Sequence, residues 1–190
     1  MTSVAITQRV LPRTFVVSLL LVVGAATVTA LAAQWRIVLP FTPVPITGQT
    51  FAVLLTGAAL GLRLGAAGQL LYVAAGIAGA PVFTEGRSGV DVVLGATGGY
   101  ILGFVVAAGL IGWMAERRQD RTFATMFTAF IVGSAVIYAF GVAGLIAATG
   151  MSLTDAIANG VVPFVFGDIL KAAGAGLILP GAWKLIGDRS

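Results

Sequence analysis

Long apolar runs dominate the chain, and their hydrophobic positions are continuous rather than alternating with polar ones. In a lipid bilayer every backbone polar group must be paired within the protein, so continuous runs of this kind predict helices rather than barrel strands. Short polar, glycine-rich or proline-rich stretches separate six runs, which predict membrane-spanning helices over residues 14–33, 49–60, 66–78, 97–115, 123–148 and 162–186. The pattern therefore predicts an all-α membrane protein, a six-transmembrane-helix bundle that forms a single integral membrane domain over residues 1–190.

Two of the six runs are short. Residues 49–60 and 66–78 fall below the roughly 20 residues that a full span needs. We therefore keep tilted, shortened or partly re-entrant helices as alternatives for these two segments. The stretch around Thr154 and Asp155, between the last two runs, is predicted to be a loop.

The first run, residues 14–33, resembles a secretory signal because Arg9 and Arg13 precede it. The apolar region of such a signal is about 7 to 15 residues long, which is shorter than this run. Further spans also follow it along the chain. We interpret the run as a retained first helix.

The composition supports a membrane protein and excludes several other classes. Hydrophobic residues make up 58% of the chain and charged residues only 9%, whereas soluble domains carry about 25% charged residues. The chain has no Cys and no His, which removes disulfides, thiol nucleophiles and imidazole chemistry. Its net charge of +4 is dispersed along the chain, so we expect no nucleic-acid partner.

The basic residues predict the orientation of the bundle. Six spans put both termini on one side, and an excess of Lys and Arg marks the cytoplasmic side of a membrane protein. The opposite loops hold only Arg36 and Arg87, and Lys171 lies inside a span. Eight basic residues fall on the terminal side: Arg9, Arg13, Arg63, Arg117, Arg118, Arg121, Lys184 and Arg189. We therefore predict that both termini are cytoplasmic.

Two ionisable residues lie within the last predicted span. Asp168 and Lys171 are three residues apart, which puts them on the same face of a helix. Charged side chains at membrane depth are costly and usually mark an interior functional site. One interpretation is an internal ion pair that neutralises itself. The other is a polar cavity in which Asp168 accepts hydrogen bonds from a ligand and Lys171 attracts an anion, and the two are compatible.

The first outer loop carries Pro40, Pro43 and Pro45, which keep it out of regular helix. A stiff segment of this kind, with Trp35 and Phe41 beside it, could cover an outward-facing pocket. Alternatively, Trp35 is an interfacial anchor and the prolines only interrupt the helices. The chain contains no phosphate-binding loop of the form G-x-x-x-x-G-K-[ST], so any pumping must be driven from outside it.

Small residues recur at every fourth position on one side of the first predicted helix, at Ala26 and Ala30 and also at Ala25, Thr29 and Ala33. Such stripes let helices approach closely. The stripe predicts close packing, either inside the bundle or against a partner subunit.

Four segments, in this order along the chain, resemble the BioY family, the biotin-specific S components of energy-coupling factor (ECF) vitamin transporters. They are Pro40-Phe-Thr-Pro-Val-Pro-Ile-Thr-Gly-Gln-Thr50, Leu71-Tyr-Val-Ala-Ala-Gly-Ile-Ala-Gly-Ala-Pro-Val-Phe83, Leu94-Gly-Ala-Thr-Gly-Gly-Tyr-Ile-Leu-Gly-Phe104 and Pro163-Phe-Val-Phe-Gly-Asp-Ile-Leu-Lys171. The resemblance implies a six-helix bundle in a prokaryotic cell (inner) membrane, with a vitamin pocket near the outer face under the first outer loop. It also implies a transmembrane coupling protein and two cytoplasmic ATPase subunits as partners.

The resemblance also implies roles for individual residues. Asp168 is assigned to the ureido N–H groups of biotin and Lys171 to its carboxylate, which suits an acceptor-only aspartate and a donor-only ammonium. Gln49, Phe83 and Tyr100 match positions that line the same cavity. Arg87 is either an outer-side cation that helps to bind the carboxylate or a solvated loop charge. We expect biotin as transported ligand, and no catalytic residue, metal or cofactor.

Three other functions were weighed. An S component for a different small vitamin fits the same bundle, because a fold does not specify its cargo. An intramembrane enzyme that uses Asp168 lacks a second carboxylate at membrane depth and has no His or Cys to complete a catalytic pair. A purely structural scaffold would not explain a charged pair in the bundle interior.

Overall fold

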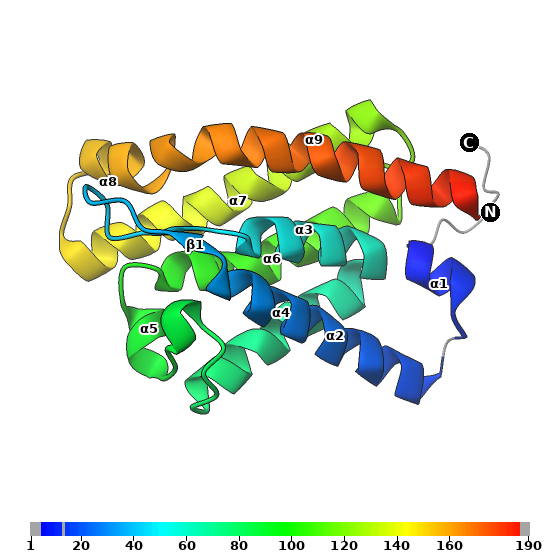
Figure 1. Cartoon of the computed structure of the whole chain (residues 1–190), viewed down its shortest axis with the longest axis horizontal. Helices are drawn as coiled ribbons and strands as arrows, with labels where there is room; N and C mark the ends of the chain where they lie inside the picture. The colour runs from blue at the N-terminus through cyan, green and yellow to red at the C-terminus, as the bar shows by residue number, and fades with distance from the viewer. Residues whose placement is uncertain (1–4, 13, 187–190) are drawn as a thin grey trace.

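The computed structural model describes residues 5–12 and 14–186, which form a bundle of helices with one short hairpin (Figure 1). Three helices are peripheral and short, and a 3-10 turn, η1, precedes one of them. In chain order the elements are α1 (Ile6–Val10), α2 (Phe15–Gln34), β1 (Arg36–Ile37), β2 (Ile46–Thr47), α3 (Gln49–Leu60), α4 (Leu62–Ile77), η1 (Thr84–Gly86), α5 (Val90–Leu94), α6 (Gly98–Ala115), α7 (Phe123–Thr149), α8 (Leu153–Gly160) and α9 (Val162–Leu185).

The six predicted runs correspond to α2, α3, α4, α6, α7 and α9. Among the described helices, four are long and apolar enough to cross a membrane, namely α2, α6, α7 and α9. Helices α3 and α4, with 12 and 16 residues, are shorter than a full span. Helix α3 has the predicted bounds, whereas α4 begins at Leu62 rather than at residue 66. Gly61 turns the chain within one residue, with φ of 85°, so the break is shorter than predicted.

The prediction of a loop around Thr154 and Asp155 is wrong, because these residues lie in α8. Ser152 caps this helix, since its Oγ accepts a hydrogen bond from the backbone N–H of Asp155 at 3.2 Å. Asp155 is itself in the first turn, where a negative charge favours the helix dipole.

Helix α6 forms the centre of the bundle and packs against α3, α4 and α7. Close approach of backbones makes this possible. A Cβ atom on Gly112 would overlap the backbone of Gly61, and one on Gly99 would overlap the backbone of α7 at Phe140 and Gly144. Small residues therefore let the central helix contact three neighbours at once.

Helix α2 buries its small-residue stripe inside the molecule. Its buried residues are Ala25, Thr29 and Ala33, while most of its large side chains are exposed. Thr29 and Gln69 of α4, both fully buried, exchange hydrogen bonds of 3.1 and 3.2 Å. The structure thus uses this stripe for internal packing against α4.

The bundle has two distinct ends. Helix α1 and the C-terminal end of α9 lie at one end, and the hairpin, α5 and α8 lie at the other (Figure 1). Gln8 donates to the Leu60 carbonyl at 3.1 Å, and the Leu62 N–H donates to Glu116 at 3.1 Å, so α1, the α3–α4 turn and the end of α6 meet. Of the eight basic residues predicted on the terminal side, Arg13 and Arg189 lie outside the described residues. The other six lie on segments at this end: Arg9, Arg63, Arg117, Arg118, Arg121 and Lys184.

Asp120, in the α6–α7 connection at the same end, is fully buried. Trp183 donates its indole N–H to this carboxylate at 2.6 Å, and the Arg121 Nε lies 3.2 Å from it. Burial raises the pKa of Asp120 above its ordinary value, although both neighbours act in the opposite direction.

Candidate functional site

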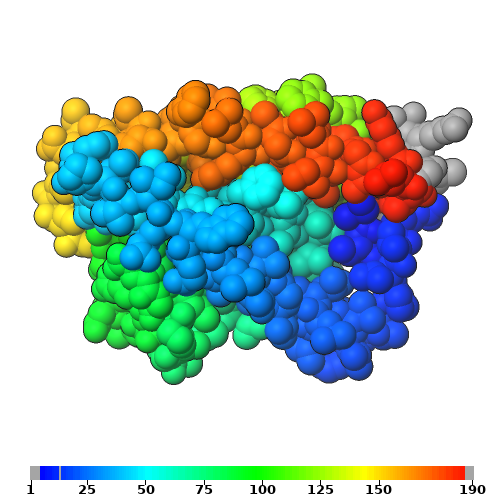
Figure 2. Space-filling model, in the orientation of Figure 1, coloured from blue at the N-terminus to red at the C-terminus, as the bar shows by residue number. Residues whose placement is uncertain are grey.

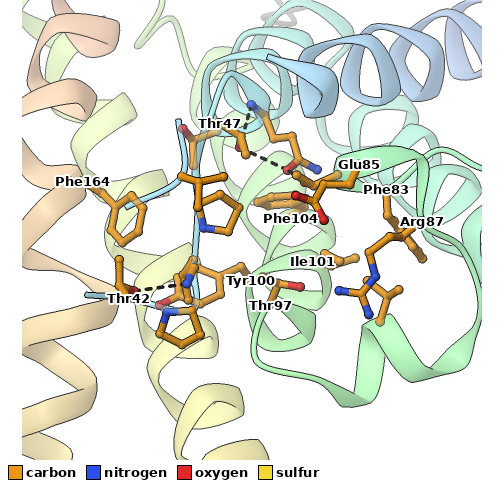
Figure 3. Close-up of a pocket in the computed structure, with 18 of the residues that line it drawn as sticks. Thr42, Thr47, Phe83, Glu85, Arg87, Thr97, Tyr100, Ile101, Phe104 and Phe164 are labelled. Carbon is orange, nitrogen blue, oxygen red and sulfur yellow. Dashed lines mark hydrogen bonds between the residues drawn. The ribbon is translucent and has the colours of Figure 1, made fainter. Parts of the chain in front are cut away.

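A cavity of about 180 Å³ lies at the hairpin end of the bundle (Figure 3). Its walls come from the hairpin, from α3, α6, α7 and α9, and from the segment that follows α4. All six residues predicted for the site line it: Gln49, Phe83, Arg87, Tyr100, Asp168 and Lys171.

Residues 36–47, here called the lid, cover this cavity. The lid starts and ends in a two-residue antiparallel pairing, Arg36 with Thr47 and Ile37 with Ile46. Pro43 and Pro45 line the cavity, as expected for a stiff cover. Trp35, by contrast, precedes the lid and is 81% exposed, which fits the alternative of an interfacial anchor for that one residue.

Contacts on two sides attach the lid to neighbouring segments. The Thr42 hydroxyl donates to the Asn159 carbonyl in α8 at 2.7 Å, and Figure 2 shows the lid lying against this segment. Arg36 pairs with Glu85 at 3.3 Å, with both side chains partly exposed. The lid is therefore closed over the cavity and attached on two sides.

Asp168 and Lys171 form an ion pair in the cavity wall. The Lys171 Nζ lies 2.8 Å from the Asp168 Oδ1, and it also donates to the Thr50 hydroxyl at 2.7 Å and to the Thr47 carbonyl at 3.0 Å. The other carboxylate oxygen, Oδ2, accepts a 2.5 Å hydrogen bond from the Tyr138 hydroxyl. The pair is thus satisfied internally, and both residues also line the cavity.

Gln49 is the centre of a second polar cluster. Its Nε2 donates to the Tyr72 hydroxyl at 2.8 Å, and its Oε1 accepts from the hydroxyls of Thr47 and Thr84 at 3.1 and 3.3 Å. The side chain is buried and connects the lid, α4 and the segment after α4. The structure places Gln49 in the cavity wall with most of its hydrogen-bonding capacity already used by the protein.

Phe83 and Tyr100 supply aromatic walls, and glycines make room for both. A Cβ atom on Gly76 would overlap the Phe83 ring, and one on Gly141 would overlap the Tyr100 ring. The Tyr100 hydroxyl donates to the Gly160 carbonyl at 2.8 Å. The aromatic faces therefore line the cavity while the Tyr100 hydroxyl is engaged by the backbone.

Arg87 lies at the exposed rim of the cavity. Figure 3 shows it on the opposite side from Phe164 and Thr42. Its carbonyl accepts a 3.0 Å hydrogen bond from the Phe83 N–H, which holds this tight segment together. Within the part of the chain that the structure describes, its guanidinium has no hydrogen bond or ion pair, so it remains available to an anion.

Thr50 and Tyr138 also line the cavity, although neither is among the residues predicted for the site. Thr50 directly follows Gln49 in a segment that was already singled out. Tyr138 is one of only three tyrosines in the chain, and all three donate or accept a hydrogen bond at or beside the cavity. A phenol within a long apolar run is therefore the signal that would have found Tyr138.

No group of three or more His, Cys, Asp or Glu side chains that could hold a metal occurs among the described residues. The charged groups of the cavity are the Asp168 carboxylate, the internally bonded Lys171 ammonium, the exposed Arg87 guanidinium and Glu85, which pairs with Arg36. Between them lie aromatic and apolar walls. This arrangement can bind a small molecule with N–H donors and an anionic group.

Comparisons with known proteins agree with the resemblance seen in the sequence. The biotin transporter BioY of Thermotoga maritima is 37% identical over 166 residues, which cover 87% of this chain and 96% of that protein. The biotin transporter BioY of Rhizobium etli is 34% identical, with 81% of this chain and 86% of that protein covered. A crystal structure of the S-component for biotin from an ECF-type ABC transporter matches with a TM-score of 0.79 and 25% identity, over 89% of this chain and 92% of that one. The model of the BioY family matches residues 4–188, and the chain belongs to this family.

Proposed function

We propose that this membrane protein captures biotin from the outer side of the membrane as the substrate-binding subunit of an ECF-type transporter. The observation that carries the proposal is the cavity, which combines a carboxylate acceptor, aromatic walls and a free guanidinium. Biotin offers matching groups, namely ureido N–H donors, an apolar ring system and chain, and a carboxylate. The relatives named as biotin transporters support this assignment, and they are transporters rather than enzymes.

In this proposal Asp168 accepts hydrogen bonds from the ureido N–H groups. An ionised carboxylate has no proton to donate, so it selects a ligand that presents donors. Asp168 is only 3% exposed, which makes an unmatched ligand group beside it costly. Phe83 and Tyr100 cover the apolar part of the ligand, and Gln49 holds the wall between the lid and α4.

The ligand carboxylate is the group for which the structure changes our expectation. Lys171 has three N–H protons, and it donates to three protein acceptors at 2.7 to 3.0 Å. Arg87 has none of its guanidinium N–H groups engaged by the described residues. We therefore propose that Arg87 binds the carboxylate and that Lys171 holds Asp168 in place, instead of the direct role for Lys171 that the sequence predicts.

We further propose that the chain is a single integral membrane domain with six spans and both termini in the cytoplasm of a prokaryotic cell. Helices α3 and α4 are only about 18 and 24 Å long at 1.5 Å per residue. At the cavity end of the bundle the lid precedes α3 and the segment 78–89 follows α4, so each adds length to its short helix. The concentration of basic residues at the opposite end supports a cytoplasmic location for that end.

The proposed partners follow from the lack of a nucleotide-binding loop. A subunit that cannot hold ATP by that route needs an external source of energy. We propose a transmembrane coupling protein and two cytoplasmic ATPase subunits, the partners that the resemblance to the BioY family implies. The structural relative is itself an S-component from an ECF-type ABC transporter. The exposed apolar surface of α2 and its neighbours faces membrane lipid.

Calorimetric titration of the detergent-solubilised protein tests this proposal. Biotin and its methyl ester are titrated into the parent chain, Arg87→Gln and Lys171→Met. We expect biotin to bind the parent more tightly than the ester does, and Arg87→Gln to remove this preference. If Lys171→Met removes the preference instead, the carboxylate belongs to Lys171. If the folded parent does not bind biotin but binds another vitamin, the alternative cargo is correct and the biotin proposal fails.

A further inference from the structure

Tyr138 occupies a position in the cavity that the proposed function does not yet use. It lies in the middle of α7, lines the cavity, and donates its phenolic proton to the Asp168 Oδ2 at 2.5 Å. Because Asp168 pairs with the Lys171 ammonium, its carboxylate is ionised and holds no proton. The proton in this short hydrogen bond therefore belongs to Tyr138, and both lone pairs of the phenolic oxygen remain for other donors.

The hydrogen bonds on Asp168 limit what the carboxylate can offer to a ligand. Two carboxylate oxygens provide about four acceptor positions. Oδ1 accepts from Lys171 at 2.8 Å and from the Thr50 hydroxyl at 3.2 Å, which uses both of its positions. Oδ2 accepts from Tyr138, which leaves one position open. Among the described residues, none donates to the Tyr138 oxygen itself.

We propose that Tyr138 is a direct ligand-binding residue, and that its phenolic oxygen and the Asp168 Oδ2 form a pair of adjacent acceptors for two N–H donors. The inference rests on the proposed function, since biotin is the ligand that supplies the two ureido N–H groups. It divides the recognition of these groups between two residues. One N–H donates to the open position on Asp168, and the other donates to Tyr138.

Thr50 is a positioning residue in this arrangement. Its hydroxyl accepts from Lys171 at 2.7 Å and donates to the Asp168 Oδ1, which closes a ring of three side chains. The ring restrains the carboxylate and occupies the acceptor positions of Oδ1. Only Oδ2 and the phenol beside it then face a donor.

A binding cycle with modified ligands tests the role of Tyr138. The parent chain and Tyr138→Phe are titrated with biotin and with two isosteric carbamate analogues, in each of which one ureido N–H is replaced by oxygen. We expect Tyr138→Phe to weaken biotin binding on the order of tenfold to a hundredfold, because one buried ureido N–H is left without an acceptor. For the one analogue that lacks the N–H facing Tyr138, the substitution should change affinity by much less.

Tyr100→Phe is the matched control, since this phenol lines the same cavity but donates to the Gly160 carbonyl. Whatever affinity it loses should be the same for biotin and for both analogues. Thr50→Val should weaken biotin binding and Thr50→Ser should restore it, because serine keeps the hydroxyl.

The outcomes separate this inference from the proposed function. If Tyr138→Phe weakens all three ligands equally, Tyr138 only maintains the shape of the site and the inference is wrong. If Tyr138→Phe binds biotin as the parent does, the inference is also wrong, while the biotin proposal stands. If the folded parent itself does not bind biotin, the proposed function fails first, before any variant is compared.

Discussion

The charges of Asp168 and Lys171 should be energetically coupled. Neutralising both should lower the free energy of unfolding by less than the sum of the losses from neutralising each one alone. The Asp168 side chain is 4% exposed and the Lys171 side chain is 20% exposed. Removing one member of a buried pair costs about 3–5 kcal/mol, because a charge is left without its partner. In Lys171→Met the carboxylate keeps Tyr138 and Thr50 as donors, so we expect the lower end of this range, about 3 kcal/mol.

The complete cycle consists of Lys171→Met, Asp168→Asn and the double variant. In Asp168→Asn, the ammonium keeps two of its three acceptors, so we expect a loss of roughly 2 kcal/mol. The double variant holds no charge at these two positions, and its loss should be smaller than the sum of the two single losses by at least about 1 kcal/mol. The free energy of unfolding is measured by circular dichroism in mixed micelles with an increasing fraction of dodecyl sulfate.

The exposed pair between Arg36 and Glu85 provides the control for this cycle. Its side chains are 36% and 49% exposed, and exposed pairs contribute at most about 1 kcal/mol. Arg36→Gln, Glu85→Gln and their combination should therefore show little coupling. If the losses at Asp168 and Lys171 add to within about 0.5 kcal/mol, the two charges do not depend on each other and the reasoning is refuted.

Three further predictions concern the walls, the lid and the opposite end. Gly76→Ala should displace the Phe83 ring and weaken biotin binding, which titration will show; unchanged affinity would mean that the ring is not held by this contact. Thr42→Val removes the hydrogen bond to Asn159 and should speed biotin dissociation several-fold in stopped-flow measurements, whereas an unaltered rate would show that this contact does not restrain the lid. Burial raises the pKa of Asp120 in the folded state above its ordinary value of 3.8, so the folded protein holds this proton more tightly than the unfolded chain does. The free energy of unfolding should therefore fall as the pH rises above 3.8. Asp120→Asn should flatten this decline, and an unaltered pH profile of the unfolding free energy would contradict the assignment.

The long elements of the fold could be predicted from the sequence because lipid imposes a simple rule on them. Continuous apolar runs must be helices, and four of the runs are long enough to cross a membrane. The rule does not apply to short peripheral segments. Helix α8 was predicted as a loop because its eight residues are fewer than the roughly 11 over which helical periodicity is read, although Ser152 is a residue type that commonly caps a helix.

Six of the residues that line the cavity could be predicted, but several of their contacts could not. The spacing of Asp168 and Lys171 put both on one face, and their pairing followed. The acceptors of Lys171 come from Thr47 and Thr50, more than 100 residues earlier in the chain. Helical periodicity says nothing about such distant neighbours, so the saturation of the ammonium, and with it the role proposed for Arg87, required the tertiary structure.

A binding site inside a membrane has to remain stable when it is empty, and the distribution of its charges explains how this one can. The Asp168 carboxylate and the Lys171 ammonium are both bonded to protein groups, so departure of a ligand leaves neither charge without a partner. Arg87 differs, because it lies at the exposed rim where water can solvate its guanidinium. We therefore expect recognition of N–H donors to rely on buried groups that stay fixed, and attraction of the carboxylate to rely on an exposed cation. Such a division lets the subunit release its cargo and return empty without an unpaired charge at membrane depth.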